Sequence, residues 1–274
     1  MMYTLIPYTL NVRGRLLSLS EPQVMGILNV TPDSFYAGSR TQAESDIARR
    51  TEQIISEGGT MIDVGAYSTR PGASYVSEDE EQARLCMAMK VVRSVSPDIP
   101  VSVDTFRSRI ARLAIEDWGA DIINDVSGGE ADEAMFATAA ELGVPYILTH
   151  NVQTQQLMPD MLLYLSHRVQ QLRDLGQKDI IIDPGYGFSK TTEQNFTLLA
   201  HQAELLIFEL PLLAGVSRKS MIYKTLDCSP AEALNGTTAL NTVALLSGAS
   251  ILRVHDVREC VEAIKLIAQM REHI

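Results

Sequence analysis

Short apolar runs recur along this chain, and each run leads to polar residues that could bind a small ligand. They show little alternation of apolar and polar residues, which is typical of parallel strands buried on both faces. The runs are 26–28 before Asn29, 61–64 before 68–70, 101–103 before Asp104, 122–123 before Asn124, 146–149 before His150, 180–182 before Asp183, 212–216 before 217–219, and 251–252 before Arg253 and His255. If all of them end on one side, their last residues form a ring of the kind in which a (β/α)₈ barrel keeps its chemistry.

Helical patterns separate the apolar runs, for example over 42–57, 157–175 and 257–267. The runs recur every 20 to 40 residues or so, roughly the room that a parallel strand and its crossover helix need. We therefore predict α/β architecture, with a single (β/α)₈ TIM barrel as one domain over residues 1–274. A doubly wound open sheet is the alternative, since periodicity alone does not show closure.

Within the first 20 residues, short pieces that alternate apolar and polar residues lie on either side of 13–15. We therefore predict an N-terminal β-hairpin that covers the barrel bottom. No apolar stretch there is long enough for a signal peptide or a membrane span. The three cysteines are scattered without a CxxC pair, which predicts neither a disulfide framework nor a zinc site and favours a reducing cytoplasm. A net charge of −11 argues against nucleic acid as a partner, so local basic groups must hold any anionic ligand.

Asp104, Asn124 and Asp183 each follow a run too apolar to face solvent. Taken singly, each is most simply a helix cap. Taken together, two carboxylates and a carboxamide at neighbouring strand ends could accept hydrogen bonds from several N–H groups of one flat heterocycle. An amino-pyrimidine edge would satisfy them.

Other candidate residues stand in the loops after the strands. The glycines of 183–188 permit a tight turn, and Phe188 could form one wall for an aromatic substrate or simply pack in the core. Lys219 could bind a ligand or be a solvated charge. Arg253 and His255 follow the last run, where many barrels bind phosphate, although His255 alone could be structural. The loops 29–35 and 68–72 are rich in hydrogen-bond donors. They could act on a ligand at the catalytic face, or they could be plain surface loops.

Seven segments, taken in order, resemble the dihydropteroate synthase family. They are 29–35, 68–72, 103–105, 123–125, 183–188, 217–219 and 253–256, and the match runs from about Met25 to the C-terminus. The resemblance implies a TIM barrel, usually a homodimer. It also implies the condensation of 6-hydroxymethyl-7,8-dihydropterin diphosphate with 4-aminobenzoate, which gives 7,8-dihydropteroate and pyrophosphate for folate synthesis.

The same resemblance implies a role for individual residues. Those expected to bind the pterin are Asp104, Asn124, Asp183, Lys219 and Arg253, with Arg253 stacked on the ring. Those expected to bind the diphosphate are Asn29, Thr69, Arg70, Arg253 and His255, with Asn29 near a Mg²⁺ ion. Those expected to bind 4-aminobenzoate, and hence sulfonamides, are Thr69, Pro71, Phe188, Lys219 and Ser220. Those expected to be catalytic are Asp33, Arg70, Lys219, Arg253 and His255.

The chemistry fits such a set of residues. Cleavage of the C–O bond leaves positive charge on the pterin methylene and negative charge on pyrophosphate, which Mg²⁺, Arg70, Arg253 and His255 would stabilise. Asp33 would stabilise the cation once the loops close, and the aromatic amine then attacks. The chain departs from the family pattern at 36–39 and at 151–155. Two alternatives remain: a corrinoid-linked methyltetrahydrofolate methyltransferase, and a pterin-binding paralogue without activity.

Overall fold

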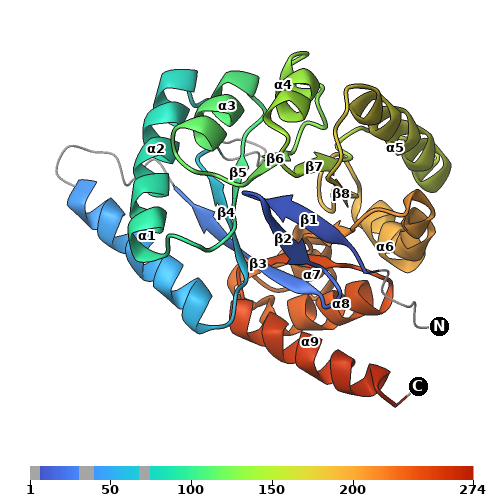
Figure 1. Cartoon of the computed structure of the whole chain (residues 1–274). Helices are drawn as coiled ribbons and strands as arrows, with labels where there is room; N and C mark the ends of the chain where they lie inside the picture. Colours follow the sequence, from blue (N-terminus) through green and yellow to red (C-terminus); the bar gives the residue numbers. More distant parts are fainter. Residues whose placement is uncertain (1–6, 31–39, 68–74, 274) are drawn as a thin grey trace.

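The computed structural model describes residues 7–30, 40–67 and 75–273 (Figure 1). Its larger sheet has the strand order β8-β7-β6-β5-β4-β3-β10-β9, and every pairing in it is parallel. The strands are β3 (Gln23–Asn29), β4 (Met61–Gly65), β5 (Val101–Asp104), β6 (Ile122–Asp125), β7 (Tyr146–Thr149), β8 (Ile180–Asp183), β9 (Leu213–Ala214) and β10 (Ile251–Val254). A parallel bridge between Ile182 and Leu212 brings β8 beside the segment that leads into β9. The sheet thereby closes, so the barrel is confirmed and the open sheet is excluded.

Helices form a ring outside the strands (Figure 1). They are α1 (Arg40–Ser56), α2 (Glu78–Val95), α3 (Ser108–Glu116), α4 (Met135–Leu142), α5 (Leu157–Asp174), α6 (Thr192–His201), α7 (Ser220–Thr225), α8 (Leu234–Leu246) and α9 (Val257–Arg271), with 3₁₀ turns η2 (Gln202–Phe208) and η3 (Pro230–Glu232). Their apolar faces pack on the strands, as Leu85, Ile110 and Leu165 do, in one buried cluster. No helix in the described ranges is both long and apolar enough to cross a membrane.

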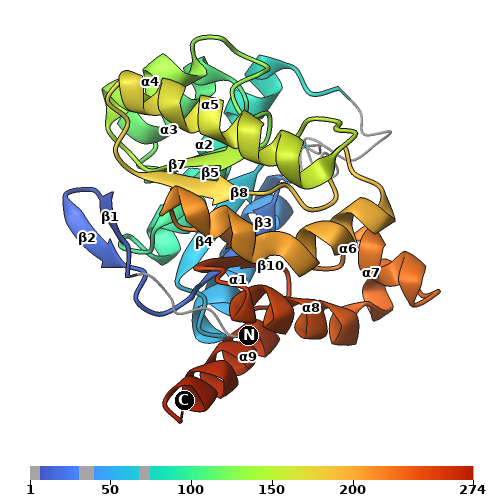
Figure 2. The ribbon, with the colours of Figure 1, turned by 90° about the vertical axis from the view of Figure 1, so that its right-hand side faces the viewer.

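The N-terminal hairpin closes one end of the barrel, as predicted. It pairs β1 (Thr9–Val12) with β2 (Arg15–Ser18) in antiparallel register. Leu10, Val12 and Leu19 are buried in a second apolar cluster with inward-facing strand residues such as Met25 and Ile181. Figure 2 shows the hairpin at one end of the barrel and α7 towards the other. The other end is therefore the one left for a ligand.

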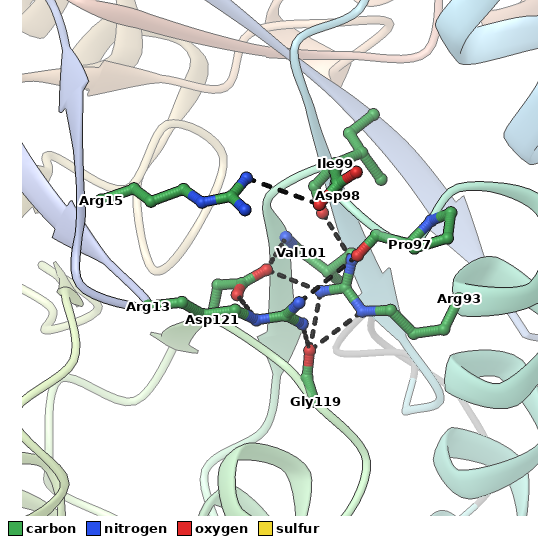
Figure 3. Close-up of polar contacts among 9 residues, drawn as sticks. All are labelled: Arg13, Arg15, Arg93, Pro97, Asp98, Ile99, Val101, Gly119 and Asp121. Carbon is green, nitrogen blue, oxygen red and sulfur yellow. Dashed lines mark hydrogen bonds and ion pairs between the residues drawn. The ribbon is translucent and has the colours of Figure 1, made fainter.

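The turn of the hairpin is anchored to the barrel by shared charges (Figure 3). Asp121 is 2% exposed and forms ion pairs with Arg13 from the turn and with Arg93 from α2, the latter at 2.6 Å. The same carboxylate accepts the backbone N–H of Val101 at 2.7 Å, and both guanidinium groups donate to the carbonyl of Gly119. Two arginines thus stabilise one buried carboxylate and fix the hairpin.

We expect Arg13→Ala to lower the free energy of unfolding by about 1 kcal/mol, because the Arg13 side chain is 42% exposed and Arg93 still pairs with Asp121. Chemical denaturation measures this, and kcat/KM should not change because the hairpin lies at the closed end. Arg15→Ala is the matched control, since Arg15 is 81% exposed and 3.5 Å from Asp98. Equal destabilisation by both variants would contradict the role given to Arg13.

Candidate active site

Alternate strands of the barrel contribute a layer of polar side chains to its interior. The layer consists of Asp63 from β4, Asn124 from β6, Asp183 from β8 and Arg253 from β10. Two positions earlier in the same strands stand Met61, Ile122, Ile181 and Ile251, all buried in the apolar cluster at the closed end. Because side chains alternate along a strand, both sets face the interior. The layer nearer the open end of the barrel is polar where an ordinary barrel core would be apolar.

Arg253 links the two carboxylates of this layer. Its Nη2 donates to Asp183 Oδ2 at 2.8 Å, and its Nη1 lies 3.9 Å from Asp63 Oδ2. The other oxygen of Asp183 accepts the backbone N–H of Gly185 at 2.8 Å. Burial would lower the pKa of Arg253, but the neighbouring carboxylates outweigh it and the pKa is raised. Arg253 therefore stays charged inside the barrel.

Asp104 lies at the end of β5, beside this layer. A Cβ added to Gly65 would lie 3.5 Å from Asp104 Oδ2 and 3.5 Å from Asn29 Oδ1, so the two side chains flank this glycine. Burial, and then the nearby charge of Asp63, raises the pKa of Asp104 well above its ordinary value. Hydrogen-bond donors from a ligand would favour its charged form.

Two loops meet at the open end of the barrel, and glycines allow them to approach closely. Gly185 has φ +73°, and a Cβ there would collide with the carbonyl oxygen of His150. Lys190 Nζ donates to the carbonyls of His150 and Gly185 at 3.0 Å each and to that of Phe188 at 3.2 Å. The loops after β7 and β8 are thereby held together.

Lys219 precedes α7 and reaches the same place. Gly187 has φ +79°, and a Cβ there would lie 2.9 Å from Lys219 Cδ, so glycine makes room for this side chain. Lys219 Nζ donates to the carbonyl of Tyr186 and lies 4.5 Å from the centre of the Phe188 ring. Burial, helped by Arg253, outweighs the attraction of Asp183 and lowers the pKa of Lys219 to about 7.

A cavity of about 440 Å³ opens beside these groups. Its lining residues include Phe188, Ser217, Lys219, Ser220, Arg253 and His255. The backbone N–H of His255 donates to Ser217 Oγ at 3.1 Å, and its carbonyl accepts Arg50 Nη2 at 2.7 Å. Arg253 belongs both to this cavity and to the polar layer, so the two are continuous. The site therefore has cationic side chains on the cavity and hydrogen-bond acceptors deeper in the barrel.

Comparisons with known proteins agree with this geometry. The model of the pterin binding enzyme family matches residues 25–255. The dihydropteroate synthase of Escherichia coli K12 is 40% identical over 269 residues, which cover 93% of this chain and 94% of that protein. The structure of the Xanthomonas albilineans dihydropteroate synthase with 4-aminobenzoic acid has a TM-score of 0.90 and 33% identity, covering 97% of this chain and 99% of that one. The chain belongs to the dihydropteroate synthase family.

A structure of the Yersinia pestis dihydropteroate synthase in complex with a sulfonamide drug is also similar. Its TM-score is 0.87 and its identity 38%, and the match covers 97% of this chain and all of that one. The family resemblance read from the sequence motifs is thus confirmed, together with the transferase class that it implied.

Most of the residues expected in the site of this family member do lie together. The structure brings Asp104, Asn124, Asp183, Arg253 and Lys219 to the open end of the barrel, with Phe188, Ser220 and His255 on the cavity and Asn29 beside Asp104. Asp33, Thr69, Arg70 and Pro71 lie outside the described residues. Arg218, in the same segment as Lys219, pairs instead with Asp256 at 2.8 Å and so ties the loop to the start of α9.

His150 differs from expectation among the polar residues that end apolar runs. Its ring packs edge-on against Tyr164 of α5, with 5.1 Å between ring centres, and so lies between the strands and the helices. The strand alternation that puts Ile147 inside the barrel puts Thr149 inside and His150 outside. After His150, the unusual loop is fixed by Asn151, which donates to the carbonyl of Val126 and accepts from Ser189 Oγ.

Two interior residues were missed by the sequence analysis. Asp63 stands within an apolar run rather than at its end, and Thr149 immediately precedes His150. Both are buried, at 5% and 0% exposure. The signal that could have found them is their spacing of two residues from Met61 and Ile147, which places them on the inner face.

Proposed function

We propose that this chain condenses 6-hydroxymethyl-7,8-dihydropterin diphosphate with 4-aminobenzoate to give 7,8-dihydropteroate and pyrophosphate in folate biosynthesis. The family membership supports the reaction, and the polar layer beside a cationic cavity is the observation that carries it here. A solved relative binds 4-aminobenzoic acid. A barrel interior with several acceptors suits a ring that presents several N–H donors.

Asp104, Asn124 and Asp183 would accept hydrogen bonds from the pterin ring, and Lys219 would donate to it. Arg253 would stack on the ring, because its planar guanidinium is already held by Asp183 at the boundary of the cavity. Bulk solvent has little access to this layer, in which Asn124 and Asp183 are 0% and 1% exposed. A pterin that reaches it would exchange solvent for fixed hydrogen bonds.

Arg253 and His255 would bind the diphosphate from the cavity, joined by Thr69 and Arg70, while Asp33 would stabilise the positive charge that develops on the pterin methylene. The roles of Thr69, Arg70 and Asp33 follow from the family resemblance alone. When the methylene C–O bond breaks, the electron pair leaves with pyrophosphate, and Arg70, Arg253 and His255 would stabilise its negative charge. The amine nitrogen of the second substrate forms the new C–N bond and gives up a proton. No covalent bond to the enzyme is needed.

Mg²⁺ fits the open end of the barrel at Asn29. Asn29 Oδ1 and Asp104 Oδ2 both flank Gly65, where no Cβ fills the space between them. No group of three or more His, Cys, Asp or Glu suited to a metal occurs within 7–30, 40–67 and 75–273, which agrees with an ion held largely by substrate phosphates. When bound, the ion would neutralise diphosphate charge, and Asn29 would supply one oxygen.

Phe188, Lys219 and Ser220 would line the 4-aminobenzoate site with Thr69 and Pro71, and sulfonamides would compete there. A cation beside an aromatic ring suits a benzoate, which carries both a carboxylate and a flat face. The three free cysteines fit a reducing cytoplasm as the compartment.

We also propose a homodimer formed through α8 and α9. Val243, Leu266 and Met270 are 39%, 72% and 41% exposed on these adjacent helices, so apolar side chains are available for an interface. Sedimentation velocity decides between dimer and monomer. A monomer at micromolar concentration would refute this assembly.

Pyrophosphate release tests the function. We expect release only when the pterin diphosphate, 4-aminobenzoate and Mg²⁺ are all present, and none when any one is omitted. Tight binding of the pterin diphosphate without release would identify a paralogue without activity. Methyl transfer from methyltetrahydrofolate to a corrinoid protein, without pyrophosphate, would identify the alternative enzyme.

A further inference from the structure

We propose that Asp63 is a positioning residue that fixes the side-chain amide of Asn124, so that its oxygen faces the pterin substrate. This inference rests on the proposed function, because it assigns a role within the same substrate site. Asp63 lies in β4 and is 5% exposed, and both of its carboxylate oxygens are occupied by Asn124 Nδ2, with Oδ2 also facing Arg253. It therefore acts through its neighbour and not by touching the reacting atoms.

The hydrogen bonds between the two residues set the direction of the amide. Asn124 Nδ2 lies 3.0 Å from Asp63 Oδ2 and 3.3 Å from Asp63 Oδ1. An ionised carboxylate only accepts hydrogen bonds, so the NH₂ group must face it. The reverse orientation would put the amide oxygen against the carboxylate oxygens, with acceptors on both sides.

Nothing else in the described ranges holds this amide. Its side chain donates to Asp63 alone there, although β5 separates the two strands. Asn124 Oδ1 is buried and has no hydrogen-bond partner within the described residues. A buried acceptor without a partner is costly, and a ligand that supplies an N–H would satisfy it.

The guanidinium of Arg253 favours the ionised form of Asp63. Its Nη1 lies 3.9 Å from Asp63 Oδ2, while its Nη2 bonds to Asp183 at 2.8 Å. Burial raises the pKa of Asp63, and Arg253 and the hydrogen bond from Asn124 act against that rise and favour the charged form, which only accepts. The layer thus presents an acceptor at Asn124, and it would reject a ring that has only acceptors on that edge.

Asp63→Asn tests the proposal, because the carboxamide introduced at position 63 can both donate and accept. Asn124 can then turn either way, and we expect the KM for the pterin diphosphate to rise by about tenfold or more. The KM for 4-aminobenzoate should stay within about twofold, since its site lies on the cavity. A purely structural role would change both together or change only the thermal unfolding temperature.

The exchange variant, Asp63→Asn with Asn124→Asp, is the rescue. The amide introduced at 63 can donate to the carboxylate introduced at 124, whose other oxygen still faces the substrate as an acceptor. Asn124→Asp alone puts two carboxylates together and should be worse. We expect the exchange variant to have a lower KM for the pterin diphosphate than either single variant, by about threefold or more.

Each outcome decides a separate question. Pyrophosphate release by the wild-type enzyme is measured first and tests the proposed function by itself. If the wild type is active and Asp63→Asn leaves the KM for the pterin diphosphate unchanged, the positioning role is wrong while the function stands. If Asp63→Asn does not fold, the exchange variant decides: it overturns the proposal if its KM is no lower than that of Asn124→Asp.

Discussion

The variant Lys219→Met is expected to lose kcat/KM by a factor of about a hundred to a thousand, as when one preorganised donor is removed from an active site. Lys219 Nζ lies on the cavity, 4.5 Å from the Phe188 ring centre and bonded to the carbonyl of Tyr186. Methionine keeps the stem that packs on Gly187 but has no charge and no donor. Steady-state kinetics on both substrates measures the loss.

The pH dependence follows from the pKa of about 7 that burial gives to Lys219. In the unfolded chain the lysine regains its ordinary pKa of 10.5, so between these values the unfolded state binds more protons. The contribution of this group to the free energy of unfolding therefore rises with pH over that window. We therefore expect the free energy of unfolding of the wild type, minus that of Lys219→Met, to become more positive from pH 7 to pH 9. The kcat/KM of the wild type should fall above about pH 7, as the cation is lost.

Lys224→Met is the matched control, since Lys224 is an exposed lysine within α7, the helix that Lys219 immediately precedes. It should keep its kcat/KM and the pH dependence of the wild type. Retention of full activity by Lys219→Met would remove Lys219 from the site.

The local pattern of the sequence was sufficient for the barrel strands and for the polar residues that end them. Asp183, for example, follows three isoleucines and lies where a strand end was expected. The local pattern could not show that the sheet closes into a barrel, because β9 has only two residues and its link to β8 is the bridge between Ile182 and Leu212. That bridge depends on the whole sheet and its shear.

Asp63 shows why the rest of the site stayed hidden. Within the run 61–64 it reads as an interruption of a buried strand, and nothing nearby identifies its partner. That partner, Asn124, is 61 residues away and is brought into contact across β5 by the layering of alternate strands. Residues that act on a ligand through a second side chain carry no motif of their own, so only coordinates reveal them.

Asp183→Asn is expected to lower the free energy of unfolding by about 3 kcal/mol and kcat/KM by about a hundredfold or more. Asp183 is 1% exposed and bonds to Arg253 Nη2 at 2.8 Å. Its loss leaves a buried guanidinium with Asp63 as the nearer remaining carboxylate, at 3.9 Å. The same change removes an acceptor from the pterin site. Chemical denaturation and steady-state kinetics measure the two losses separately.

The barrel itself offers a control for Asp183→Asn at its closed end. Asp121 is also almost fully buried, at 2% exposure, and pairs with Arg93 at 2.6 Å and with Arg13 (Figure 3). Asp121→Asn should therefore destabilise the protein by a similar amount, about 3 kcal/mol. Its kcat/KM per folded molecule should equal that of the wild type, because no substrate reaches the hairpin. If Asp121→Asn lost as much activity as Asp183→Asn, a weakened barrel would explain both, and Asp183 would have no special place in the chemistry.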